Sequence, residues 1–211
     1  MKKYFSKITQ WVKGLFSKFK KKEEIQKEIP LEDAFRMWRE QQRKKKKRMA
    51  LKYIVSLVFI VVYFTFGHEL GFATSSPLWT HFSYSFQHAG LLHLIINTLV
   101  FIGAFRTMEE FISWQKVLVS IYVIAVIASF GAVRAIPTVG ASGMIHAMFG
   151  MMAVIVTLNK SLPKQKAIFF CSIGIMMIVS LFNSNSNFTV HALSFGMGAL
   201  YYLAHKQFNK I

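Results

Sequence analysis

Long stretches without a charged residue constrain this chain more than any other feature of its sequence. Between Tyr53 and Phe105 the only Asp, Glu, Lys or Arg is Glu69, and none occurs at 135–159 or 167–205. Uncharged apolar runs of roughly 17–25 residues are long enough to cross a bilayer as helices. A bundle of helices in water would need a polar face on each helix, and these stretches leave none. We therefore predict an integral, multi-pass membrane protein.

The same runs predict six transmembrane helices separated by short polar turns. These spans are 50–67, 90–108, 115–133, 141–159, 165–183 and 189–206. None of them alternates apolar and polar residues as the wall of a membrane β-barrel would. Helices also satisfy their own backbone hydrogen bonds, which lipid cannot do for them. The predicted fold class is therefore an all-α membrane protein, a bundle of six transmembrane helices.

The distribution of basic residues predicts the orientation of this bundle. Lys and Arg number 26 against 9 Asp and Glu, a formal net charge of +17. They gather in residues 1–50, in the turns 106–116 and 160–166 and at the C-terminus, whereas the segments on the other side of the membrane carry only Arg134. Because cytoplasmic segments are enriched in Lys and Arg, both termini should be cytoplasmic. We expect the plasma membrane of a bacterium as the location.

Residues 1–49 are predicted to form a basic cytoplasmic arm before the membrane domain at 50–211. Apolar and aromatic side chains recur along 4–19 at three- and four-residue spacing, with lysines between them. This pattern is typical of an amphipathic helix that lies on anionic lipid. The run 43–48, Arg-Lys-Lys-Lys-Lys-Arg, indicates a juxtamembrane anchor, with a nuclear signal or a nucleic-acid patch as alternatives. Since the basic residues flank an apolar bulk, we expect no nucleic-acid partner.

Polar residues inside the spans gather near the outer ends of three helices. His88, His93 and Asn97 lie at the start of the second span, Ser142 at the start of the fourth and His191 at the start of the sixth. Polar residues are costly in lipid and by default suggest a functional site. A helix places His93 and Asn97 on one face, because they are four residues apart. The topology therefore brings a hydroxyl, imidazoles and an amide to one depth of the membrane.

Metal and disulfide chemistry are disfavoured by the sequence. Cys171 is the only cysteine, so no disulfide can form within the chain. The seven histidines raise the possibility of zinc, but the segment His68-Glu69-Leu70-Gly71-Phe72 lacks the second histidine of the zinc-protease helix motif. We therefore predict no metal and no cofactor.

These polar residues give the chain a resemblance to the rhomboid intramembrane serine proteases over about 50–208. The motifs that carry it are His88-Ala-Gly-Leu-Leu-His93-Leu-Ile-Ile-Asn97, Glu109 after it, Gly140-Ala-Ser142-Gly143, His191 with Gly198 seven residues later, and Trp79 in the first outer loop. The resemblance implies a rhomboid-like bundle and a catalytic pair of Ser142 and His191. It further implies that His93 and Asn97, with the Ser142 backbone N–H, stabilise the oxyanion. Gly140, Gly143, Gly198, His88 and Glu109 would be structural motif residues.

Three positions depart from the family's pattern. Thr80 follows Trp79 where the family often has Arg, Ser194 stands where a Gly usually follows the histidine, and His146 stands where an aromatic residue is common. Thr80 could change the packing of the outer loop, Ser194 the close approach of the fourth and sixth spans, and His146 the ring stacking under His191. His146 is also a rival base, because it lies four residues from Ser142 on the same helix face.

The function implied by the resemblance is hydrolysis of a peptide bond in or near the outer end of a transmembrane segment. The substrates would be single-pass or other transmembrane proteins. Serine needs a base to take its proton, and the few acidic residues of the membrane domain favour a Ser-His pair over a triad. Two alternatives stay open: a rhomboid-like pseudoprotease that binds transmembrane segments without cleaving them, and a small transporter or channel, which would need a polar path through the inner halves of the spans.

Overall fold

The structure is a computed structural model that describes residues 52–66, 68–158, 163–183 and 185–208, with single positions at 36, 40 and 50. The chain forms two compact units, 1–47 and 48–211, and the helical bundle is the second of them. The predicted amphipathic helix at 4–19 and the basic run at 43–48 lie outside the described residues, so both stay predictions.

The described residues form seven α-helices and no strand, which confirms the prediction of an all-helical fold. The six long helices are Lys52–Thr65, α4 (Leu91–Met108), α5 (Trp114–Phe130), α6 (Ser142–Leu158), α7 (Pro163–Phe182) and α8 (Phe188–Phe208). Each of them begins and ends within about three residues of a predicted span. The seventh helix is α3 (Thr80–Ser83), which the sequence did not predict; it lies between two 3₁₀ turns, η1 (His68–Leu70) and η2 (Tyr84–Phe86).

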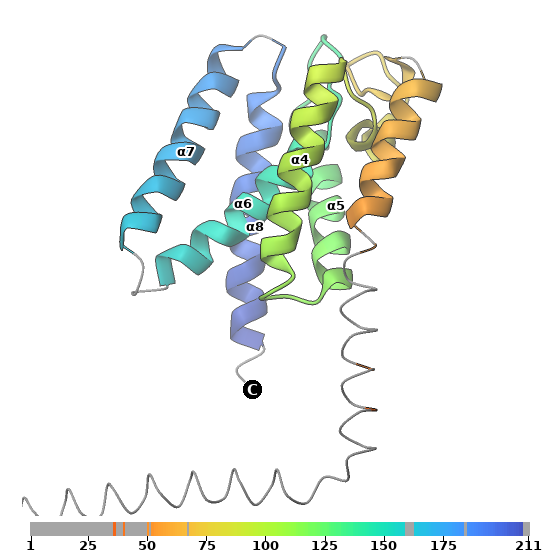
Figure 1. The fold of residues 1–211 in the computed structure, drawn as a ribbon. Coiled ribbons are helices and arrows are strands. Elements are labelled where there is room, and N and C mark those ends of the chain that lie inside the picture. Colours follow the sequence, from red (N-terminus) through yellow and green to blue (C-terminus); the bar gives the residue numbers. More distant parts are fainter. Residues whose placement is uncertain are drawn as a thin grey trace, which may run out of the picture. The chain divides into compact units, whose positions relative to one another are not determined.

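Helix α6 lies at the centre of the bundle (Figure 1) and packs most extensively against α8, and next against α5 and α4. Helices α4, α6 and α8 all run downward from the upper half of the bundle in Figure 1, with α6 beginning deeper than the other two, while α5 and α7 run back toward the upper end. Helix α7 packs against α6 and α8 far less extensively than these two pack against each other. The first turns of α4, α6 and α8 therefore share one end of the molecule.

Two glycines allow α6 and α8 to pack backbone against backbone. A Cβ atom on Gly150 of α6 would collide with the carbonyl oxygen of Phe195, and one on Gly198 of α8 would collide with that of Ala147. Small residues permit such close helix contacts in membrane proteins. The departure at Ser194 therefore does not keep α6 and α8 apart, and Ser194 itself is fully buried.

The segment between the first helix and α4 folds against the bundle. Its residue Phe72 pairs with Thr138 of the α5–α6 loop as an isolated antiparallel bridge, with N···O distances of 3.2 and 2.9 Å. The buried Tyr84 donates its hydroxyl to the carbonyl of Ala125 on α5 at 2.9 Å. Thr80 is also buried, and its hydroxyl donates to the carbonyl of Pro77 at 2.6 Å, so the departure at this position is accommodated inside the loop.

A buried ion pair joins the first helix to the end of α4. The Lys52 ammonium lies 2.8 Å from a carboxylate oxygen of Glu109, and the two side chains are 3% and 10% exposed. Removing one partner of a buried ion pair leaves an uncompensated charge, which typically costs about 3–5 kcal/mol. Glu109, which the family motif includes, therefore forms an ion pair with Lys52, a residue outside the motif.

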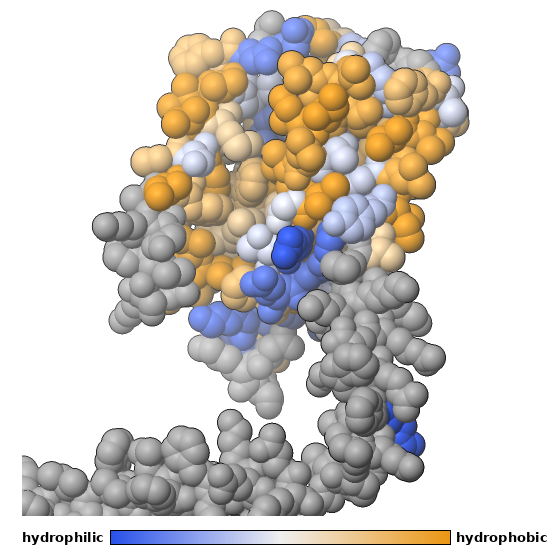
Figure 2. All heavy atoms as spheres, viewed as in Figure 1, coloured by the Kyte–Doolittle hydropathy of each residue, from blue (hydrophilic) through white to orange (hydrophobic). Residues whose placement is uncertain are grey.

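Much of the outer surface of this unit is apolar. By length and hydropathy, one described helix, Leu91–Met108, could cross a bilayer, and four further apolar helices are shorter: Lys52–Thr65, Trp114–Phe130, Ser142–Leu158 and Ile168–Phe182. Apolar side chains cover much of the face shown in Figure 2, including the upper part of α4. Exposed examples are Leu92, Leu99, Ile168, Phe182 and Leu200, all more than 60% accessible. Soluble monomers rarely expose large contiguous apolar surfaces.

Candidate active site

Ser142 is the first residue of α6 and follows a glycine with a backbone conformation that other residues rarely adopt. Gly140 has φ of +120°, and its N–H donates to the carbonyl of Tyr84 at 2.9 Å. Glycine reaches this region without a steric penalty because it has no Cβ. The loop thus turns sharply into α6 and leaves the Ser142 side chain partly exposed at the end of the helix.

His191, in the first turn of α8, faces Ser142. Its Nε2 lies 2.8 Å from the Ser142 Oγ, although the two residues are 49 positions apart in the sequence. His191 is 8% exposed, so its ring lies inside the bundle while the hydroxyl remains partly accessible. This distance is within the range that a proton transfer from a serine to a histidine requires.

His146, the rival base, contacts Ser142 through the backbone. Its Nδ1 lies 2.7 Å from the carbonyl oxygen of Ser142, which can only accept, so Nδ1 carries the proton. The imidazole rings of His146 and His191 stack with centroids 4.1 Å apart and an angle of 6° between the planes. The family commonly has an aromatic residue at position 146, and here the His146 ring takes its place by stacking on His191.

His93 and Asn97 lie on one face of α4, beside Gly140. A Cβ atom at Gly140 would lie 3.1 Å from the His93 Nε2 and 3.8 Å from the Asn97 Nδ2, so both nitrogen atoms border the same point. The Ala89 N–H donates to the His93 Nδ1 at 3.4 Å, which places the proton of the neutral ring on Nε2. Asn97 donates one amide hydrogen to the carbonyl of His93 at 2.9 Å and keeps a second one.

His88 lies just before α4 and is buried. The N–H of Ala141, next to Ser142, donates to the His88 Nε2 at 3.5 Å, and the rings of His88 and His93 lie 5.3 Å apart, edge to face. His88 therefore contacts both the loop before Ser142 and the ring of His93.

The remaining motif residues lie around this cluster or away from it. Gly143 packs under Tyr84, where an added Cβ would lie 2.8 Å from the tyrosine oxygen. Gly198 lies at the close contact between α6 and α8, and Glu109 pairs with Lys52 at the opposite end of α4. The structure thus brings Ser142, His191, His93, Asn97, Gly140 and His88 together and leaves Glu109 apart from them.

Sequence reasoning missed three polar residues that hold His191 and its helix. The hydroxyl of Ser180, on α7, lies 2.7 Å from the His191 Nδ1, and Ser186 lies 3.5 Å from the same atom. Asn187 precedes α8, accepts the Val190 N–H at 3.3 Å and donates to the carbonyl of Ala132 at 2.8 Å. An asparagine immediately before a helix is a recognised N-cap signal that could have been read from the sequence.

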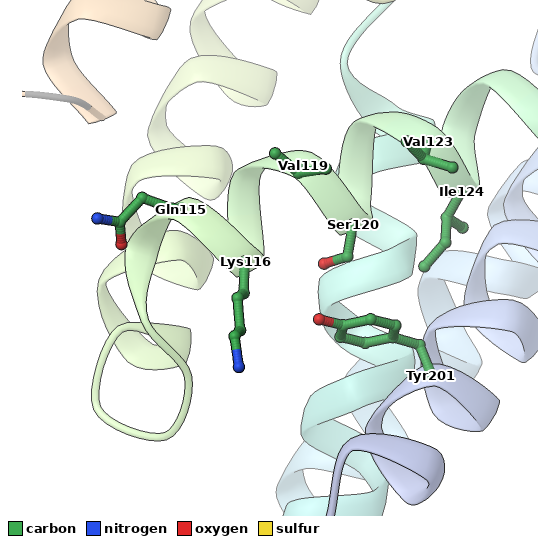
Figure 3. A pocket seen from close by; sticks show the side chains of 7 residues that line it. All are labelled: Gln115, Lys116, Val119, Ser120, Val123, Ile124 and Tyr201. Carbon is green, nitrogen blue, oxygen red and sulfur yellow. The ribbon is translucent and has the colours of Figure 1, made fainter. Parts of the chain in front are cut away.

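A separate groove of about 460 Å³ is lined by residues of α5 and by Tyr201 of α8. Figure 3 shows its lining, in which Val119, Val123 and Ile124 provide the apolar surface and Ser120 and Tyr201 provide hydroxyls. None of these residues belongs to the Ser142 cluster. Among the described residues, no group of three or more His, Cys, Asp or Glu is arranged to hold a metal ion.

The fold and this site define a helical bundle with an apolar exterior and a serine–histidine pair between two of its helices. The Rhomboid domain family model matches residues 75–207, which include the whole cluster. The chain therefore belongs to the rhomboid family, whose members are embedded in membranes. A comparison with curated proteins gives no match.

Proposed function

We propose that this protein is an intramembrane serine endopeptidase in which Ser142 is the nucleophile and His191 the general base. The observation that carries the proposal is the 2.8 Å distance between the Ser142 Oγ and the His191 Nε2. A neutral hydroxyl is a weak nucleophile, and an adjacent imidazole activates it by accepting its proton. Family membership agrees with this chemistry but does not by itself distinguish a protease from a pseudoprotease.

In the acylation step, the Ser142 Oγ attacks the carbonyl carbon of the substrate while its proton passes to the His191 Nε2. The tetrahedral intermediate collapses when His191 returns this proton to the leaving amine, which breaks the peptide C–N bond. A water molecule then attacks the acyl-serine by the same route and regenerates Ser142. The partial exposure of Ser142 at the end of α6 gives water the access that this second half requires.

The developing oxyanion would be stabilised by donors already in place beside Ser142. The His93 Nε2–H and the second hydrogen of the Asn97 amide border the space next to Gly140. Donors that are fixed in a water-poor site need no reorganisation when negative charge appears. This arrangement supports the assignment of His93 and Asn97 as oxyanion donors, together with the Ser142 backbone N–H.

We further propose that the six long helices span the bilayer, with both termini in the cytoplasm of a bacterium. The apolar exterior and the positive-inside distribution of Lys and Arg support this topology. The first turns of α4, α6 and α8 then lie near the outer surface. The substrates would be transmembrane proteins whose helix unwinds near its outer end, because a peptide bond within a helix is shielded from attack by its own backbone hydrogen bonds.

The proposal is tested by labelling the purified protein in detergent with a fluorophosphonate probe, which reacts with activated serines. We expect covalent labelling of Ser142 in the wild type and none in Ser142→Ala, with peptide mapping to identify the site. Ser172→Ala serves as a control, since Ser172 is exposed on α7 and distant from the cluster in the sequence. A folded wild type that neither reacts with the probe nor cleaves co-expressed single-pass proteins would favour the pseudoprotease.

Replacing Asn97 by alanine should lower kcat by about 10²-fold with little change in KM, because a donor to the oxyanion acts mainly in the transition state. Cleavage kinetics of a transmembrane substrate in proteoliposomes measure both constants. Thr98→Ala is a matched control, since Thr98 is the next residue and its buried hydroxyl has no hydrogen-bond partner among the described residues. Equal kcat values for Asn97→Ala and Thr98→Ala would contradict the role of Asn97.

A further inference from the structure

Two serine hydroxyls contact the side of His191 that faces away from Ser142. The Ser180 Oγ lies 2.7 Å from the His191 Nδ1, and the Ser186 Oγ lies 2.7 Å from the Ser180 Oγ and 3.5 Å from the same ring nitrogen. Ser142, His191, Ser180 and Ser186 thus form one continuous chain of hydrogen-bonding groups. No described carboxylate makes a hydrogen bond to this ring.

We propose that Ser180 and Ser186 are positioning residues that orient the His191 ring, with Ser180 accepting a hydrogen bond from its Nδ1–H, in the place that a carboxylate occupies in a catalytic triad. This inference rests on the proposed function. A neutral His191 that accepts a proton at Nε2 must carry its own hydrogen on Nδ1. Once protonated, the ring donates from both nitrogens, and a buried donor without an acceptor is costly.

The hydroxyl pair can meet this requirement without itself taking up a proton. The His191 Nδ1–H donates to a lone pair of the Ser180 Oγ, whose own hydrogen can point to the Ser186 Oγ. Each serine hydroxyl offers one hydrogen and two lone pairs and can rotate to suit its partner. Both O–H dipoles therefore already present their negative ends to the ring when the imidazolium forms, and they keep this orientation when His191 protonates the leaving amine.

Three separate chain segments fix this geometry. Ser180 is buried in the last turn of α7, and Ser186 lies in the tight turn between α7 and α8, where its N–H donates to the carbonyl of Asn183 at 2.9 Å. The Arg134 guanidinium donates to the Ser186 carbonyl at 2.7 Å from the α5–α6 loop. A turn held from both sides is suited to presenting a hydroxyl at a constant position. The contact with Ser180 also makes the orientation of His191 depend on where α7 lies.

The first test compares Ser180→Ala with Ser180→Thr and with Ser172→Ala. Loss of a hydrogen bond to a charged group predicts a fall in kcat of about 10- to 100-fold for Ser180→Ala with little change in KM. Ser180→Thr retains the hydroxyl and should recover most of the rate. Ser172→Ala makes the same change on an exposed face of the same helix and should equal the wild type. Equal kcat values for Ser180→Ala and Ser172→Ala would overturn the proposal.

The second test reads the His191 ring directly and does not depend on activity. In protein labelled with ¹⁵N-histidine, with the signal assigned through His191→Gln, we expect the Nδ1–H tautomer in the wild type. The double variant Ser180→Ala/Ser186→Ala should give a mixture of tautomers, and an unchanged spectrum would overturn the inference. A wild type that neither cleaves nor reacts with a fluorophosphonate would overturn the proposed function instead, and the tautomer would still decide whether the hydroxyl pair orients the ring.

Discussion

Replacing His191 by alanine should lower the rate of cleavage by at least about 10³-fold, whereas replacing His146 by phenylalanine should lower it by less than about tenfold. A general base contributes typically 10² to 10⁴, and removing one member of a nucleophile–base pair disables the other. Of these two rings, only His191 has a nitrogen hydrogen-bonded to the Ser142 hydroxyl, whereas the His146 Nδ1 donates to the Ser142 carbonyl. Initial rates on a transmembrane substrate in proteoliposomes give both values.

The phenylalanine variant is chosen because it keeps the ring that stacks 4.1 Å from His191 and removes only its hydrogen-bonding nitrogens. His146→Phe therefore tests whether His146 supports His191 by stacking or itself accepts the proton of Ser142. His146→Ala removes both, and its additional loss relative to His146→Phe measures the contribution of stacking. Retained cleavage in His191→Ala together with abolished cleavage in His146→Phe would move the general base to α6.

The sequence predicted the long helices well because charged residues, or short runs of polar residues such as 183–187, interrupt the apolar runs close to most helix ends. It could not predict α3, since Thr80–Ser83 is a single turn whose formation depends on packing against α5. The pairing of Lys52 with Glu109 was also out of reach, because the two residues are 57 positions apart and neither shows a pattern that names the other. The pattern of apolar residues predicts where each helix lies in the sequence, but it does not predict which residues of distant helices come into contact.

The cluster around Ser142 was predictable for a related reason. Histidine and asparagine are rare enough in the predicted spans that they stand out together with Ser142, and the alternating helix directions bring these five residues to the same end of the bundle. Ser180 and Ser186 gave no such signal. Serine is common at helix contacts in membranes and at turns, and α7 approaches His191 from a segment with no other polar motif. Only the geometry distinguishes these two hydroxyls from ordinary ones.

Adding a single methyl group at Gly150 or Gly198 should destabilise the fold by about 3 kcal/mol, which lowers the midpoint of thermal unfolding by roughly 10 °C for a domain of this size. The added Cβ would collide with the carbonyl oxygen of Phe195 or Ala147. These are backbone atoms, so no side chain can rotate away and the two helices must separate. Thermal unfolding in detergent measures the loss.

Gly196→Ala is the matched control, because Gly196 lies on the same helix as Gly198 and a Cβ there meets nothing within 4 Å. We expect its midpoint to equal or slightly exceed that of the wild type, since alanine favours a helix. Gly198→Ala should also slow cleavage at temperatures where it is still folded, because α6 carries Ser142 and α8 carries His191. A separation of these helices lengthens the 2.8 Å contact on which the proposed proton transfer depends. If Gly198→Ala has the same midpoint of thermal unfolding as the Gly196→Ala control, the close backbone contact does not hold the site together.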